Sequence, residues 1–229
     1  MALMFDPKSA DLLAHDHHLP AVAPADLQPE ALVRRFAQPP AWRPDVEVER
    51  WMRSPNPRPA SVLVPLVMRP EPTVLLTQRT AHLSQHAGQI SFPGGRQDPE
   101  DLHPEATALR EAQEEVGLSP DRVRVLGSLP LYTTGTGFVV TPVVGLITPQ
   151  DGEAHALALQ PQADEVAEIF EVPLAFLMDP ANHQRRGVQV GPQTLEFFAM
   201  PWQAPGEQEY FIWGATAAML RNLYRFLAA

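Results

Sequence analysis

The chain is organised around Gly94-Gly95-Arg96-Gln97-Asp98-Pro99-Glu100-Asp101 and Ala108-Leu109-Arg110-Glu111-Ala112-Gln113-Glu114-Glu115-Val116-Gly117-Leu118. This run is typical of a glycine turn, a polar loop and a short acidic helix. Pro104 suits the first helical turn, because its missing N–H is not needed there. Gly117 suits the position just after the helix, where the backbone becomes left-handed. The run therefore predicts a helix between these two residues.

The predicted helix has an apolar side and an acidic side. At 3.6 residues per turn, one stripe is formed by Ala106, Leu109, Ala112 and Val116. The opposite side is expected to carry Glu111, Glu114 and Glu115. Glu111 and Glu115 are one turn apart, so two carboxylates can reach one cation. Oxygen ligands suit magnesium or manganese, which also bind substrate phosphates. The alternative for such a segment alone is a solvated face, in which Arg110 and Glu114 form an ordinary i,i+4 pair.

The whole run resembles the Nudix box, the metal-binding loop–helix–loop of the Nudix hydrolases. That pattern is Gly, five residues, Glu, seven residues, Arg-Glu-apolar-x-Glu-Glu-x-Gly-apolar. Its second half is matched by Arg110, Glu111, Ala112, Glu114, Glu115, Gly117 and Leu118. Its first half departs from the pattern, because Asp101 stands where the family has Glu and one extra residue then precedes Arg110. The family's first glutamate is therefore not assigned to a residue of this chain.

A second block is similar to the extended motif of the coenzyme A pyrophosphatase branch of the family. It consists of Leu75-Leu76-Thr77-Gln78-Arg79-Thr80 and Gly88-Gln89-Ile90-Ser91-Phe92-Pro93-Gly94-Gly95. That branch usually has an arginine where this chain has Ser84, so part of the ligand contact that the resemblance implies is not assigned to a residue of this chain. The C-terminal Ile212-Trp213-Gly214-Ala215-Thr216-Ala217 also resembles that branch.

The resemblance implies an α/β fold, the Nudix α/β/α sandwich with a mixed β-sheet. It also implies metal-dependent hydrolysis of the pyrophosphate of coenzyme A or acyl-coenzyme A, giving 3′,5′-ADP and (acyl-)4′-phosphopantetheine. One alternative is a broader Nudix pyrophosphatase that acts on ADP-ribose, NADH or nucleoside triphosphates, because it would use the same box. A second alternative is a non-catalytic Nudix-like nucleotide-binding module, although such modules typically lose box carboxylates that this chain retains.

Roles for the site residues follow from this chemistry. Glu111 and Glu115, with Glu114 as a third, are expected to bind Mg²⁺ or Mn²⁺, and Gly95 is expected to add a backbone carbonyl. Arg110 is expected to orient the acids. The general base stays open between Glu165, Glu168 and Glu114, with Glu165 preferred because it stands at a loop-to-strand boundary. Arg79 is expected to contact the substrate, in particular the 3′-phosphate of coenzyme A, and a structural salt bridge is the alternative.

Composition limits the partners. The 229 residues carry 17 Lys+Arg against 27 Asp+Glu, a net charge of −10, so a nucleic-acid-binding surface is not expected. The absence of cysteine excludes disulfides and thiolate catalysis. No apolar run reaches the length of a membrane span, and no signal peptide is evident, so we expect a cytoplasmic enzyme that acts on a small molecule. Association into a homodimer is left open.

The order of elements predicts one catalytic domain. Residues 1–25 are expected to be a flexible extension, and residues 26–229 the Nudix domain, with the box at about 95–118. A helix is expected after Asp26 and before Pro39. Strands are predicted at 61–68, 73–77, 123–129, 138–147, 164–172, 187–190, 194–198 and 210–213, and a closing helix from Thr216. Pro65 is expected at a bulge or on the solvent side of an edge strand.

Overall fold

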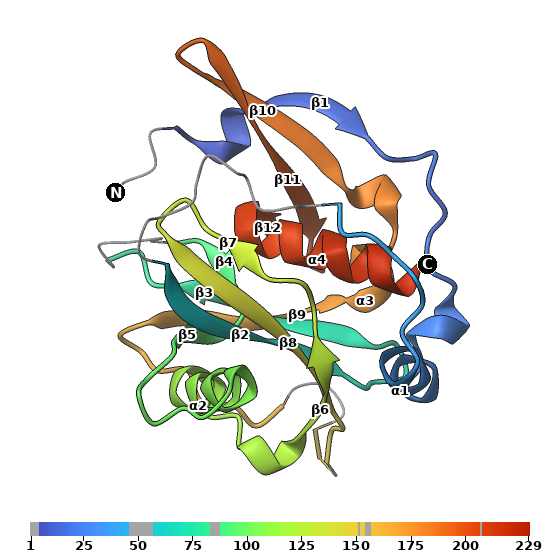
Figure 1. Cartoon of the computed structure of the whole chain (residues 1–229), viewed down its shortest axis with the longest axis vertical. Helices are drawn as coiled ribbons and strands as arrows, with labels where there is room; N and C mark the ends of the chain where they lie inside the picture. The colour runs from blue at the N-terminus through green and yellow to red at the C-terminus, as the bar shows by residue number, and fades with distance from the viewer. Residues whose placement is uncertain (1–4, 46–56, 83–87, 151, 154–156, 207) are drawn as a thin grey trace.

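The structure is a computed structural model that describes residues 5–45, 57–82, 88–150, 152–153, 157–206 and 208–229 (Figure 1). Its centre is a mixed sheet in the order β4-β3-β2-β8-β6, with β5 beside β2, β7 beside β8 and β9 beside β3. Its strands are β2 (Arg58–Val67), β3 (Thr73–Arg79), β4 (Ile90–Ser91), β5 (Gly94–Arg96), β6 (Val123–Ser128), β7 (Tyr132–Thr133), β8 (Phe138–Ile147) and β9 (Val166–Pro173). β2 and β8 run parallel over their whole length, and β3 and β9 are antiparallel.

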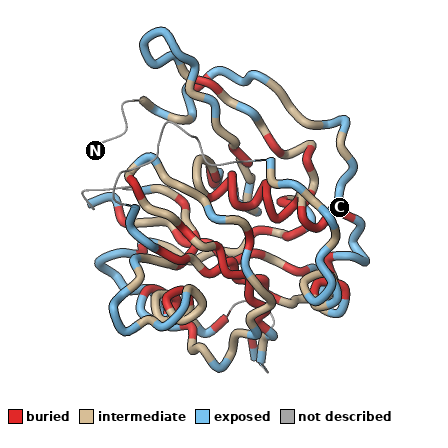
Figure 2. The backbone as a smooth tube through the Cα atoms, viewed as in Figure 1, coloured by how far each residue is buried: buried red, intermediate tan, exposed pale blue. Residues whose placement is uncertain are grey.

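Helices cover both faces of this sheet, as the alternation of side chains along β2 requires. Leu63 and Val67 point into a core shared with helix α2 (Pro104–Val116). Val64 and Leu66 point into the larger core shared with helix α4 (Gly214–Leu227). Figure 1 shows the sheet between these two helices, and Figure 2 shows most of α4 as buried. The predicted α/β/α sandwich with a mixed sheet is therefore confirmed.

A second, four-stranded sheet lies on the α4 side, and the sequence did not indicate it as a separate unit. Its order is β1 (Asp11–His15), β10 (Gln184–Val190), β11 (Gln193–Gln203) and β12 (Glu209–Trp213), all antiparallel. β1 comes from the segment predicted as a flexible extension. Val22, in the same segment, is buried with 7% of its surface exposed. Residues 5–25 therefore pack on the body of the protein, because β1 completes the edge of this sheet.

The remaining helices are short. α1 (Pro29–Ala37) follows a 3₁₀ turn at Pro24–Leu27, and α3 (Leu174–Leu177) follows β9 directly. Further 3₁₀ turns lie at Pro7–Ser9, Pro120–Arg122 and Pro180–Asn182. Within the described ranges, no helix combines the length and the apolar character needed to cross a membrane.

Pro65 does not lie at an edge. β2 is an interior strand, and Pro65 is buried opposite Gly145 of the parallel partner β8. The reason lies on the other side of β2, where β5 pairs with 60–62 and β3 pairs with 66–67. The Leu63 N–H donates toward that side, to the Pro93 carbonyl at 2.9 Å. The nitrogen of Pro65, two residues on, points to the same side in the gap between the two partners, so its missing N–H costs little.

The Nudix-box helix has the predicted ends but a different buried face. Gly117 ends α2 with a left-handed φ of 70°, and the His103 ring accepts from the Ala106 N–H at the start. The buried residues are Thr107, Ala108, Ala112, Glu115 and Val116. The expected position of Glu115 opposite the apolar stripe was wrong. At about 100° per residue, Glu115 projects between Thr107 and Ala108, near the middle of the buried face.

A buried polar network joins the N-terminal segment to α4. The Arg221 guanidinium, with 3% of its side chain exposed, pairs with Asp16 at 2.9 Å and with Asp45 at 2.7 Å. It also donates to Nδ1 of His183 at 3.0 Å, while Nε2 of His183 donates to the Leu177 carbonyl at 2.8 Å. This geometry requires a neutral His183, because Arg221 has no acceptor to offer. Burial lowers the pKa of His183 to about 4.

Candidate active site

The glycine turn and the acidic helix meet at β5. The Gly94 N–H donates to Oε2 of Glu115 at 3.2 Å. At Gly95, an added Cβ would lie 2.5 Å from the Cδ and both carboxylate oxygens of Glu111. β5 is held in place by β2, where Gly94 pairs with Val62 and Gly95 with Ser61. A side chain therefore fits at neither glycine: at Gly95 it would meet the Glu111 carboxylate, and at Gly94 it would meet Ser61 and Val62 of β2.

The three glutamates of the box differ in exposure. Glu115 is buried, with 5% of its surface exposed, Glu111 is half-buried and Glu114 is exposed. Burial raises the pKa of Glu115 to about 7; the Gly94 N–H and Arg79 oppose this shift, and the charges of Glu111 and Glu165 add to it. Burial also raises the pKa of Glu111, against the opposing charge of Arg110. The site thus holds like charges in a poorly solvated place, where a cation would relieve their repulsion.

Arg110 links the acids on the outer side of α2. Its guanidinium lies 3.0 Å from Glu111 and 2.9 Å from Glu114. It also donates to the Arg96 carbonyl at 3.0 Å, which ties the helix to β5. These contacts include the ordinary i,i+4 pair with Glu114 that was the alternative, and the orienting role of Arg110 stays a prediction.

Asp101 is the residue of this site to which sequence reasoning gave no role. Its two oxygens accept from Nε of Arg110 at 3.2 Å and from Nη2 at 2.9 Å. The Asp98 N–H donates to the same carboxylate at 2.9 Å. The hydrogen bond from Arg110 holds the pKa of Asp101 at about 2. Asp101 thus fixes the guanidinium from the loop side, at the position where the family pattern has Glu. The signal was present in the sequence, since an acid stands six residues after Gly95.

Arg79 and Glu165 lie on the inner side of the cluster. Nη1 of Arg79 is 3.7 Å from Glu115, and Nη2 is 3.9 Å from Glu165. Both ion pairs are long, and no described residue accepts a hydrogen bond from the buried Nε of Arg79. Arg79 therefore stands between two carboxylates with donor capacity left over. Ser84, where the branch usually has arginine, lies outside the described residues.

Glu168, the other residue weighed as general base, points away from the cluster. Its carboxylate accepts from the Tyr210 hydroxyl at 2.6 Å and from the Gln208 amide at 3.3 Å. Burial and the hydrogen bond to Glu168 raise the pKa of Tyr210 to about 12. Glu168 lies in β9, whereas Glu165 lies in the turn just before that strand, and the two carboxylates have different partners. The geometry thus brings Glu165, and not Glu168, next to Arg79 and the box.

The donor set suits a hard divalent cation. In the part of the chain that the structure describes, no three acidic or histidine side chains are grouped tightly enough to hold an ion as they stand. Glu115 is instead engaged by Gly94 and Arg79, and Glu111 by Arg110. The fit is chemical: the donors are all oxygens, two of them half-buried or buried among like charges, and no side chain stands on Gly95.

The C-terminal motif packs against this region. The Thr216 hydroxyl, at the start of α4, donates to the Ile90 carbonyl of β4 at 2.9 Å. β4 immediately precedes the glycine turn, so the block at residues 88–95 and the motif at 212–217 are in contact. The C-terminal stretch therefore contacts the block that leads into the glycine turn.

Comparison with known proteins gives the family. The NUDIX domain model matches residues 57–190. A protein of Cronobacter sakazakii named "Uncharacterized Nudix hydrolase NudL" is 47% identical over 173 residues, which are 73% of this chain and 82% of its own. The protein of the same name from Salmonella paratyphi B is 44% identical over the same shares. Among solved structures, the Nudix hydrolase RenU of M. smegmatis is 25% identical, covers 51% of this chain and 71% of its own, and has a TM-score of 0.42. From the matched domain and these relatives, the chain belongs to the Nudix family and is a pyrophosphatase hydrolase.

Proposed function

We propose that this Nudix hydrolase cleaves the pyrophosphate of coenzyme A or of an acyl-coenzyme A, giving 3′,5′-ADP and (acyl-)4′-phosphopantetheine. One observation carries the proposal. Arg79 comes from the block at residues 75–95, whose pattern is similar to the coenzyme A branch, and it lies 3.7 Å from Glu115 of the Nudix box. The block is thus part of the site, and does not only resemble the branch in sequence.

Nudix hydrolases generally use divalent metal ions. In this chain Glu111, Glu114, Glu115 and the Gly95 carbonyl would hold the ion, and we propose Mg²⁺ or Mn²⁺. When bound, such an ion neutralises phosphate charge and lowers the pKa of a coordinated water. Arg110 then has the task of keeping the box carboxylates in place, since it contacts Glu111 and Glu114 while Asp101 holds it from behind.

Glu165 is the residue best placed to take the proton from the attacking water. Its side chain is exposed, and its carboxylate lies 3.9 Å from Nη2 of Arg79, whose Nη1 lies 3.7 Å from Glu115 of the box. A general base in this position would accept the proton of a water held next to the box carboxylates. Glu114, the third candidate, is already engaged by Arg110.

The position of Arg79 changes the expected contact. It stands among the carboxylates that would surround the pyrophosphate, whereas the 3′-phosphate belongs to the ribose beyond it. We therefore expect Arg79 to contact the pyrophosphate, and another basic residue to meet the 3′-phosphate. Arg79→Ala should then lower the kcat/KM of coenzyme A and dephospho-coenzyme A by a similar factor. A loss confined to coenzyme A would instead support the original 3′-phosphate assignment.

The test is product analysis with a panel of coenzyme A, octanoyl-coenzyme A, ADP-ribose, NADH and ATP, in the presence of Mg²⁺. The proposal expects the highest kcat/KM for a coenzyme A compound, and 3′,5′-ADP as a product. Glu115→Gln should lower the rate by about 10²-fold, since one charged partner of the transition state is lost. If ADP-ribose, NADH or ATP is cleaved best, the broader pyrophosphatase replaces this proposal. If nothing is cleaved with Mg²⁺ or Mn²⁺, the binding module replaces it.

A further inference from the structure

Two arginines lie just beyond the glycine turn, and the chemistry above uses neither side chain. Arg96 follows Gly95 in β5, so their Cα atoms are about 3.8 Å apart. Arg58 is the first residue of β2, the strand that pairs with β5. Both arginines are exposed. Arg79 lies on the other side of the turn, where its N–H donates to the Gln89 carbonyl at 2.9 Å.

The register of the sheet puts Arg58 and Arg96 on the same face. Arg96 is paired with Ala60 across β5 and β2, so these two side chains share a face. Arg58 points the same way as Ala60, because it is two residues away on the same strand. Diagonal neighbours of this kind lie about 7–8 Å apart, so one phosphate group can contact both guanidinium groups.

Arg58 is held in position without an anion. Its guanidinium carbon lies 4.0 Å from the centre of the Phe138 ring, and its Nη2 donates to the Thr136 carbonyl at 2.9 Å. Of its five N–H donors, one is used in this way, and the described residues supply no further acceptor. The side chain is therefore ordered and still has donors for a ligand.

Neither arginine has an acidic partner among the described residues. Four arginines elsewhere in the chain do pair with carboxylates, namely Arg69, Arg110, Arg122 and Arg221. In a chain with a net charge of −10, the two neighbouring guanidinium groups are thus a local excess of positive charge. A phosphate monoester carries a charge of about −1.5 to −2 at pH 7 and matches the guanidinium geometry.

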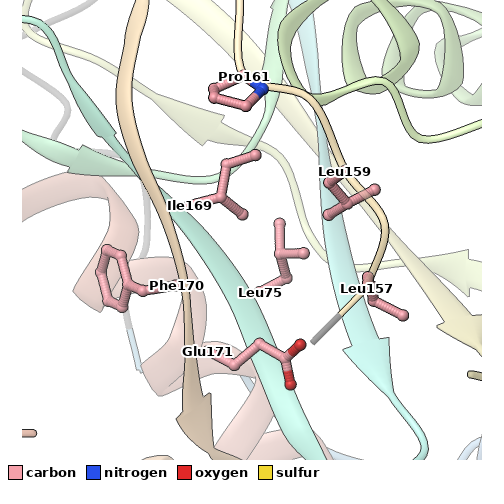
Figure 3. A pocket seen from close by; sticks show the side chains of 7 residues that line it. All are labelled: Leu75, Leu157, Leu159, Pro161, Ile169, Phe170 and Glu171. Carbon is pink, nitrogen blue, oxygen red and sulfur yellow. The ribbon is translucent and has the colours of Figure 1, made fainter. Parts of the chain in front are cut away.

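The other open space near the box has no such charge. A pocket of about 490 Å³ lies between β3, β9 and residues 157–161, and Figure 3 shows Leu75, Ile169 and Leu159 around it. Among the described residues that line it, Glu171 is the one charged side chain, and none is an arginine or a lysine. A phosphate monoester would find no cation in this pocket, so the arginine pair is the better place for it.

The reach of the substrate fits this arrangement. In coenzyme A, six bonds join the phosphorus of the 3′-phosphate to the nearer phosphorus of the pyrophosphate. Three bonds of an extended chain span about 3.8 Å, so the two phosphorus atoms are at most about 7.5 Å apart. This is about two residues along a strand. With the pyrophosphate at the carboxylates beside Gly95, the 3′-phosphate is within reach of Arg96 and of its diagonal neighbour Arg58.

We propose that Arg58 and Arg96 form a site for a phosphate monoester on the ribose of the substrate, which in coenzyme A is the 3′-phosphate. The inference rests on the proposed function. Hydrogen bonds to a charged group are lost without that phosphate, so the kcat/KM of coenzyme A should exceed that of dephospho-coenzyme A by at least about tenfold. The product 3′,5′-ADP should inhibit at least about tenfold more strongly than 5′-AMP, which lacks only the 3′-phosphate. Both ratios should fall as salt is added, because the site is exposed.

Arg96→Gln and Arg58→Gln test the pair without changing a box carboxylate. Each should lower the kcat/KM of coenzyme A and leave that of dephospho-coenzyme A nearly unchanged, so that the ratio between the two substrates falls. Arg96→Lys keeps the charge and should retain part of the ratio. Arg124→Gln is the matched control, since Arg124 is exposed on β6 at the edge of the main sheet, and it should match the unaltered protein. Thermal unfolding of each variant shows that it is folded.

The outcomes separate this site from the overall function. A preference for coenzyme A and for 3′,5′-ADP that both glutamine variants reduce, and Arg124→Gln does not, supports the site. The inference is overturned if the unaltered protein shows no such preference, or if the preference survives in both variants. An equal loss on coenzyme A and dephospho-coenzyme A gives the arginines another task and also overturns it. If ADP-ribose, NADH or ATP is cleaved and no coenzyme A compound is, the proposed function has failed. The inhibition of that reaction by 3′,5′-ADP and by 5′-AMP then decides the site by the same ratio.

Discussion

Gly95→Ala tests whether the glycine turn serves the carboxylates of the box. The added Cβ would lie 2.5 Å from the Glu111 carboxylate, and ordinary contact begins near 3.4 Å, so the carboxylate must move by about 1 Å. Gly95 is not among the glycines with a left-handed φ, so alanine is compatible with the backbone itself. The variant is therefore expected to fold and to misplace one catalytic group.

A displacement of this size costs about 10²-fold in rate, which corresponds to about 2.7 kcal/mol of transition-state stabilisation. The assay is kcat/KM with saturating Mg²⁺, next to circular dichroism and thermal unfolding. Glu111→Gln provides the matched background. Once that carboxylate has lost its charge, moving it should matter little, so Gly95→Ala should add much less than a further 10²-fold. Near-normal activity of Gly95→Ala, or full additivity of the two changes, would refute the reasoning.

Three further predictions concern the base, the anchor of Arg110 and the buried histidine. Glu165→Gln should lower kcat by about 10²-fold or more and leave KM nearly unchanged, whereas Glu168→Gln should retain activity. Steady-state kinetics of both variants checks this, and the assignment is wrong if Glu168→Gln loses activity and Glu165→Gln does not. Asp101→Asn should keep the fold and raise the Mg²⁺ concentration needed for half-maximal activity, because Arg110 loses its charged partner. An unchanged Mg²⁺ concentration for half-maximal activity would show that Asp101 does not position Arg110. His183 has its pKa lowered to about 4, so its contribution to stability is complete above the unfolded value near 6.5 and is lost as pH falls toward 4. Unfolding by urea at pH 7 and at pH 4 should therefore show a loss of up to about 3 kcal/mol that His183→Gln lacks, and equal losses in both proteins would argue against it.

The sequence was most informative where local rules and a long motif agree. The ends of α2 follow from Pro104 and Gly117, and both are as predicted. The strands β8 and β9 and the closing helix α4 were also found, because their apolar runs are long. Periodicity alone did not predict which side of α2 packs against the sheet. The apolar stripe chosen from Ala106 and Leu109 was reasonable, but the helix packs with Glu115 inward, a charge that burial alone would disfavour.

Contacts between segments that lie far apart in the chain could not be predicted from the sequence, because local patterns do not show which segments pair. β1 looks patternless because it is a short edge strand whose paired residues in β10 lie 169 to 176 positions further along the chain. Pro65 argued for an edge, and only the gap between β3 and β5 explains an interior proline. The sequence favoured Glu165 over Glu168 as the base only by its place at a loop-to-strand boundary. The structure separates the two by partner, because Glu165 lies 3.9 Å from Arg79 whereas Glu168 accepts from the Tyr210 hydroxyl. The role of Asp101 needed the position of Arg110 in space.

The network around Arg221 bears on how the chain can be shortened. The family match spans residues 57–190, yet Asp16 and Asp45 lie before it and Arg221 lies after it. The segments before and after the matched span are thus joined by ion pairs to Arg221 on α4. An expression fragment cut to the matched span would lose α4 and uncover the larger core. A fragment that starts after Asp45 would keep α4 but leave a buried guanidinium without either anion, which is strongly destabilising. A working fragment must therefore retain Asp16, Asp45 and the whole of α4.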